Sequence, residues 1–205
     1  WDVNEKGGSG PDIHGRDPLR PFKTVEEMVV ALSEMFHEIS SDLGGKFDRL
    51  VEMDTLDLDT RKGKAPGGYQ YYLEKSRIPF IFMNSAGLQG DLETMIHEAG
   101  HAFHSLYCSH LELIDERSYP IEFAEVASMS MELLTQPWWD KFYDSEEVER
   151  ARKSHLEGVV FFCLTSPSLE DSFLTTKDFF FELIFFLYII KLENKKNKIK
   201  IKFFS

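Results

Sequence analysis

Apolar residues recur every three or four positions in four parts of the 205-residue chain, which is the spacing of one face of an α-helix. These four predicted helices cover residues 24–39, 88–108, 121–134 and 145–160. The first has the sequence of a capping box, in which Thr24 precedes the helix and Glu27 follows three residues later. After it, Gly44-Gly45 either breaks the helix or belongs to a second short helix that continues through residues 47–51.

Two shorter stretches have the composition of β-strands. Residues 69–73 and 78–83 are rich in aromatic and β-branched side chains and are separated by a predicted turn at 74–77. Segment 78–84 is predicted either to offer its edge to an extended peptide or to be an inner strand. The segments 54–68 and 109–119 are expected to be loops. The pattern as a whole predicts a mainly α fold with a small β-sheet, of the α+β class.

Charge narrows the range of partners. The chain is 42% hydrophobic and 28% charged, which is typical of a globular protein. Its net charge is −12, and this argues against nucleic acid or an acidic membrane surface as the main partner. The apolar run 179–190 contains Glu182 and is too short to span a membrane. We therefore expect neither nucleic acid nor a membrane as a partner.

Composition also changes along the chain. Residues 161–205 hold ten of the 18 phenylalanines and seven lysines against five acidic residues, whereas the preceding part is strongly acidic. We therefore expect a folded region at 1–162 and a distinct Phe/Lys-rich tail at 163–205. The two cysteines, Cys108 and Cys163, form no disulfide framework, and the sequence shows no secretory leader. A reducing cytoplasm is the expected compartment.

The most informative chemistry lies on the second predicted helix, in the sequence His97-Glu98-Ala99-Gly100-His101. Positions four apart share a helix face, so the imidazoles of His97 and His101 can bind one Zn²⁺. Glu98 stands beside such a metal, where a carboxylate can take a proton from a bound water. Gly100 costs the helix about 1 kcal/mol relative to alanine, which predicts that another part of the chain packs closely against it.

A third ligand is expected on the next helix. A zinc site of the two-His, one-carboxylate type needs an acidic residue there, and the candidates are Glu122, Glu125 and Glu132. Glu125 is favoured because apolar residues flank it on both sides, and an acid in such surroundings needs a partner. An offset of one or two helical turns exceeds what a zinc–carboxylate bond tolerates, which argues against the other two as ligands.

Three segments together resemble the M3 family of zinc metallopeptidases, with the oligoendopeptidase F branch as the nearest subgroup. They are Phe80-Ile-Phe-Met-Asn84, His97-Glu-Ala-Gly-His-Ala-Phe-His104 and Glu122-Phe-Ala-Glu-Val-Ala-Ser-Met129. The resemblance implies a zincin-like core in which the HExxH helix is crossed by a helix carrying a Glu ligand. It further implies one zinc ion bound by His97, His101 and Glu125, with Glu98 as the catalytic base. Oligopeptides are the implied substrates of such a zinc metalloendopeptidase.

Other residues have less defined roles. His104 and Glu132 are candidates to orient a metal ligand through a hydrogen bond, and an ordinary helix histidine is the competing interpretation of His104. The family also carries a His- and Tyr-rich segment downstream of its Glu ligand. Here only Tyr143, His155 and Tyr188 have suitable chemistry after Glu125. The alternative hypothesis is therefore a truncated remnant that binds zinc without hydrolysing peptides.

Overall fold

A computed structural model describes residues 15–165 of the chain. The predicted tail region 163–205 lies almost wholly outside the described residues. The chain divides into two compact units between Ser154 and His155, within the last helix. The elements are α1 Val25–Ile39, α2 Ser41–Glu52, β1 Leu56–Asp59, β2 Gly68–Leu73, β3 Ile78–Ser85, α3 Gln89–Cys108, α4 Ile114–Arg117, α5 Ile121–Thr135, a 3-10 helix Gln136–Lys141 and α6 Ser145–Thr165. All further description concerns the first unit.

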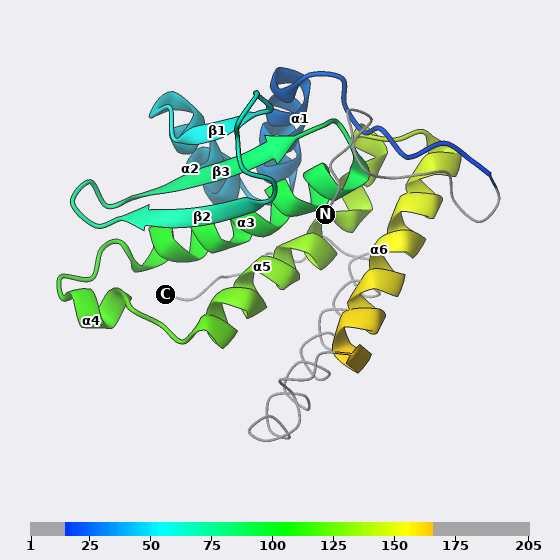
Figure 1. The fold of residues 1–205 in the computed structure, drawn as a ribbon. Helices are drawn as coiled ribbons and strands as arrows, with labels where there is room; N and C mark the ends of the chain where they lie inside the picture. Colours follow the sequence, from blue (N-terminus) through cyan, green and yellow to red (C-terminus); the bar gives the residue numbers. More distant parts are fainter. Residues whose placement is uncertain (1–14, 166–205) are drawn as a thin grey trace. The chain divides into compact units, whose positions relative to one another are not determined.

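The three strands form one sheet in the order β1-β3-β2 (Figure 1). β1 runs parallel to β3, and β2 runs antiparallel to it. Of the two interpretations of segment 78–84, the inner strand is the one observed, because β3 is paired on both sides. The two edge strands of the sheet are therefore β1 and β2. Residues of β3 alternate between buried and half-buried positions after Ile78 and Pro79, as expected for a central strand.

Two expectations for the region between the first helix and the sheet need correction. The loop predicted for 54–68 contains strand β1, in which Leu58 is buried. The Leu-Asp-Leu-Asp sequence of β1 does not favour a strand by itself, because it is short and aspartate is depleted in strands. Its extended conformation therefore depends on pairing with β3. Among the predicted loops, 109–119 likewise includes the single-turn helix α4.

The glycine pair is not where the first helix ends. α1 ends before Ser40, whose side chain accepts a hydrogen bond from the N–H of Asp42 and caps α2. Both glycines lie inside α2. A Cβ atom on Gly44 would stand 2.3 Å from the His37 ring, so the glycine allows α1 and α2 to pack closely.

Helix α3 lies between the sheet and α5 (Figure 1), and its buried face forms the centre of the core. The side chains of the core that are almost completely buried include Met28, Leu32, Phe36, Phe47, Leu50, Ile81, Met83, Leu92, Met95, Ile96 and Trp139. Phe36 of α1 packs edge-on against Phe103 of α3, with ring centroids 4.9 Å apart. This packing fixes α3, and therefore the histidine motif, against the rest of the first unit.

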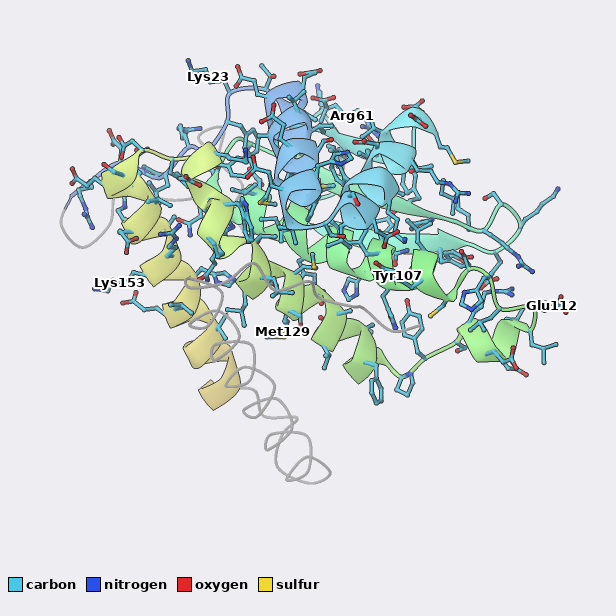
Figure 2. The ribbon with its side chains drawn as sticks, turned by 180° about the vertical axis from the view of Figure 1, so that it is seen from behind. Lys23, Arg61, Tyr107, Glu112, Met129 and Lys153 are labelled. Atoms are coloured by element: carbon cyan, nitrogen blue, oxygen red, sulfur yellow. The ribbon has the colours of Figure 1, made fainter. Side chains whose placement is uncertain are left out.

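The predicted close packing at Gly100 is confirmed. A Cβ atom at this position would lie 2.6 Å from Ser128 Cα and 3.0 Å from the Ala127 carbonyl oxygen, both in the backbone of α5. The absence of a side chain therefore lets the two helices touch backbone to backbone. Figure 2 shows these two helices from behind, with Tyr107 labelled on α3 and Met129 labelled on α5.

Candidate metal centre

The two histidines of the motif face the same side of α3. Their ring centroids are 4.8 Å apart and the ring planes meet at 83°. His97 and His101 have side chains that are 25% and 13% exposed. They are thus reachable from solvent while most of each ring is covered. The helix delivers this geometry because residues four apart stand one above the other.

Glu125 of α5 faces both imidazoles across the helix pair. Its Oε2 lies 3.3 Å from His97 Nε2, and its Oε1 lies 3.7 Å from His101 Nε2. Three ligand atoms from these residues lie within 4.8 Å of one another. Ligand atoms bound about 2.1 Å from a tetrahedral metal are separated by about 3.4 Å. The two nitrogen–oxygen separations of 3.3 and 3.7 Å are close to that spacing, so this donor set could hold a zinc ion.

A second carboxylate on α5 binds the opposite nitrogen of the first histidine. Glu132 Oε1 lies 2.6 Å from His97 Nδ1, and the Glu132 side chain is only 14% exposed. A carboxylate in this place accepts a hydrogen bond from Nδ1–H and leaves Nε2 free for a metal. The structure therefore brings Glu132 next to a proposed ligand. It lies two helical turns after Glu125, on the same face of α5.

The electrostatics of this cluster favour a bound cation. Burial alone lowers the pKa of His97, but the hydrogen bonds to Glu125 and Glu132 outweigh it and raise the pKa to about 10. The hydrogen bond from His97 lowers the pKa of Glu125. Burial and the neighbouring His97 lower the pKa of His101, which keeps its imidazole in the neutral form that binds metals. The two carboxylates thus attract positive charge, from a proton or from a metal ion.

Glu98 is buried beside the imidazoles, with 7% of its surface exposed. Burial raises the pKa of its carboxyl group, which makes it a stronger base than an exposed glutamate. The backbone N–H of Gln70 in β2 donates a hydrogen bond to it. This contact links the edge strand to the metal centre. The sequence does not predict this contact, because the donor is a backbone group and any residue type at position 70 other than proline would supply it.

His104 has a different environment from the other histidines of the motif. Its ring packs against Tyr119, with centroids 4.1 Å apart, and its Nδ1 is buried without a hydrogen-bond partner in the described part of the chain. The structure does not bring it into contact with a proposed ligand. Tyr143 is buried and packs near Trp139. Tyr188 lies outside the described residues.

The sheet lying on a HExxH helix, with a carboxylate supplied by a crossing helix, is the zincin-like arrangement of metallopeptidases. The sequence pattern of Peptidase family M3 matches residues 23–175, which extends beyond the boundary expected near residue 162. The chain belongs to this family.

Curated relatives and solved structures agree with this assignment. Oligoendopeptidase F from a Lactococcus lactis subsp. cremoris plasmid is 28% identical over 123 residues, which are 60% of this chain and 20% of that protein. The chromosomal oligoendopeptidase F is 29% identical over 126 residues, 61% of this chain and 20% of that protein. A protein assigned as an oligoendopeptidase F in Bacillus anthracis str. Ames has a similar structure, with a TM-score of 0.69 and 35% identity over 73% of this chain and 27% of that chain.

PZ peptidase A, solved with an inhibitor, is similar to the same degree: its TM-score is 0.68, with 35% identity over 72% of this chain and 26% of that chain. This chain therefore spans about a fifth of the length of the curated relatives that it matches. Among the described residues, no helix is both long enough and apolar enough to cross a membrane.

Proposed function

We propose that this chain carries the catalytic centre of a zinc-dependent metalloendopeptidase that hydrolyses peptide bonds in oligopeptides. The observation that carries the proposal is the convergence of His97, His101 and Glu125, whose ligand atoms lie within 4.8 Å of one another. These three residues would hold one Zn²⁺. When bound, zinc lowers the pKa of a coordinated water and polarises the carbonyl of the cleaved bond.

Glu98 supplies the proton transfers of the reaction. Its carboxylate takes a proton from the attacking water and passes it to the leaving amine, so one residue acts as base and then as acid. The raised pKa of this carboxyl group supports the role, because a stronger base removes the proton more readily. Glu132 holds the His97 ring in place through its 2.6 Å contact to Nδ1. We do not assign His104 a part in this step.

The free edge of β2 is our candidate for binding the peptide backbone. Asn84 of β3 donates to the Gly67 carbonyl, so alternate residues of β2, Gly68, Gln70 and Tyr72, direct their backbone groups away from β3. An extended peptide added to this edge would form a fourth strand. Because Gln70 contacts Glu98, the peptide residue that lies opposite Gln70 would be close to the reacting groups.

Zinc content is the first test. Purified wild-type protein should contain one zinc per chain, whereas His97→Ala should contain far less, as measured by atomic absorption after dialysis. Wild-type protein without bound zinc would refute the proposal. A Lys153→Ala variant is a matched control, because Lys153 is exposed and lies on α6, outside the candidate centre.

Turnover is the second test, and it separates an active enzyme from the alternative. Because the chain spans a fifth of its relatives' length, zinc binding without hydrolysis is the specific competing outcome. A quenched fluorescent oligopeptide should be cleaved by wild type and not by Glu98→Gln with zinc content unchanged. Stoichiometric zinc with no cleavage by wild type would instead support an inactive remnant.

From cysteine usage we also propose a reducing compartment such as the cytoplasm.

A further inference from the structure

A pocket of about 220 Å³ lies at the C-terminal end of α3, between β2 and the connection to α5. Its lining includes Tyr72, Glu74, Ser105, Cys108, Arg117 and Tyr119. None of these side chains has a role in the proposed reaction, in which Tyr72 takes part only through its backbone. Their polar groups are nevertheless arranged as a binding site, with a buried cation on one side and a buried hydroxyl on another.

Arg117 is the buried cation of the pocket. Its side chain is only 5% exposed. Nε and Nη2 donate to Glu74 Oε2 at 3.3 and 2.8 Å, and Nη1 donates to the carbonyls of Leu111 and Glu112 at 2.6 and 2.9 Å. Figure 2 labels Glu112, whose backbone carbonyl is one of these acceptors. A guanidinium has five N–H groups, so one at Nη2 is left for a ligand.

Tyr72 supplies the second donor. Its hydroxyl is buried and has no hydrogen-bond partner in the part of the chain that the structure describes. Buried hydroxyls are almost always paired, so this hydroxyl is available to a molecule that enters the pocket. Burial raises the pKa of this phenol, so it keeps its proton and can donate. Glu74 Oε2 accepts both bonds from Arg117, which leaves Oε1 as an acceptor on the same wall.

The pocket is placed along the path of a peptide bound to β2. Gln70 and Tyr72 are two residues apart and face the same side of the sheet, toward α3. Gln70 Nε2 donates to Ser105 Oγ at 3.4 Å, which confirms that direction. A peptide paired antiparallel with β2 would run from Leu73 toward Gly68. The peptide residue opposite Tyr72 would point into the pocket and precede the residue opposite Gln70 by two positions.

We propose that this pocket is a substrate subsite on the N-terminal side of the cleaved bond, and that it takes a neutral side chain ending in an amide. The proposal rests on the proposed peptidase function. A glutamine amide donates to the Glu74 carboxylate while its carbonyl oxygen accepts from Tyr72 or Arg117. A lysine side chain has no acceptor for the Tyr72 hydroxyl, and a glutamate carboxylate has no donor for Glu74. A leucine leaves the Tyr72 hydroxyl unpaired.

Cys108 makes occupancy of the pocket measurable without turnover. Its thiol lines the pocket, and a Cys163→Ser change in the full chain leaves it as the single cysteine. The measured quantity is the rate at which iodoacetamide alkylates Cys108 in the presence of a peptide. The four peptides are N-acetylated tetrapeptides with Gln, Leu, Glu or Lys at the second position and alanine at the other three. The glutamine peptide should half-protect Cys108 at a concentration about tenfold lower than the leucine peptide, which corresponds to one hydrogen bond.

A Tyr72→Phe variant is the matched control, because it removes only the unpaired hydroxyl and should leave folding intact. In this variant the preference for glutamine over leucine should fall to within about threefold. Equal protection by all four peptides, protection by none, or an unchanged preference in Tyr72→Phe would overturn the subsite. The assay needs no zinc and no cleavage. Cleavage without selective protection would remove the subsite and keep the peptidase, while selective protection without zinc or cleavage would support the pocket and count against the peptidase.

Discussion

Replacing Gly100 by alanine is predicted to destabilise the protein although alanine is the better helix former. The added Cβ would stand 2.6 Å from Ser128 Cα, whereas two carbon atoms in contact prefer about 3.5–4.0 Å. The obstacle is backbone, which cannot rotate away as a side chain can. α3 and α5 must therefore separate by about 1 Å.

Two opposing effects determine the size of the change. Alanine in a helix interior contributes about 1 kcal/mol relative to glycine. Overpacking a well-filled interface costs about 1–3 kcal/mol, and contact with backbone belongs at the upper end of that range. We therefore expect the free energy of unfolding to fall by about 1–2 kcal/mol. Zinc should bind more weakly as well, because the same shift moves Glu125 from the histidines and metal–ligand distances tolerate only about 0.2 Å.

Urea denaturation and zinc competition with a chelator measure both effects. Gly90→Ala is the matched control, since Gly90 lies in the same helix and a Cβ there would have no neighbour within 4 Å. That variant should be as stable as wild type or slightly more stable, with unchanged zinc affinity. If Gly100→Ala behaves like Gly90→Ala in both measurements, the close approach of the two helices does not constrain the site.

Three further predictions concern single side chains. Glu132→Gln should weaken zinc binding about 10–100-fold in a competition assay with little change in stability, and an unchanged affinity would mean that the carboxylate does not orient His97. Thr24→Ala should lower the free energy of unfolding by about 1 kcal/mol, because it removes the acceptor for the first turn of α1. Asp57→Asn should cost about 1.5–3 kcal/mol by chemical denaturation at pH 7, because it removes the charged partner of Lys64, whose side chain is 1% exposed, while the backbone carbonyls of Asp57 and Asp59 still accept from Lys64. The hydrogen bond from Arg61 lowers the pKa of Asp57, so the stabilisation is complete above pH 4 and is lost as the pH falls through the folded-state pKa. Wild type should therefore lose more stability than Asp57→Asn between pH 4 and pH 2, and parallel pH curves would contradict this.

The helices around the candidate centre were predictable because their signal is local. α3 shows its apolar period over five turns, and Pro120 precedes α5 where a first helical turn tolerates proline. Glu125 is favoured over the other acidic residues because apolar residues flank it in the sequence, and this signal is also local. Its contacts to both histidines depend on how the two helices cross, and Gly100 was the one sequence feature that indicated a close crossing.

The features that the sequence did not reveal depend on partners far along the chain. β1 has only Leu56 and Leu58 as an alternating pattern and becomes a strand by pairing with β3. Of the two interpretations of Gly44-Gly45, the second short helix is the one observed, and the serine cap at Ser40 determines where α1 ends and α2 begins. The order of the strands places β3 in the centre and β2 at one edge of the sheet. This order depends on the parallel pairing of β1 with β3, which no local sequence pattern predicts.

The proposed metal ligands, the catalytic base and the supporting carboxylate all come from a helical hairpin between residues 97 and 132. A metal that joins the two helices would close a loop formed mainly by residues 109–120, and closing a loop of this size is entropically inexpensive compared with pairing distant strands. The site thus has low contact order, whereas the sheet edge beside it depends on pairing with β3. We expect the hairpin to assemble early during folding and zinc to accelerate it, so that the proposed catalytic centre forms before the proposed peptide-binding edge of the sheet.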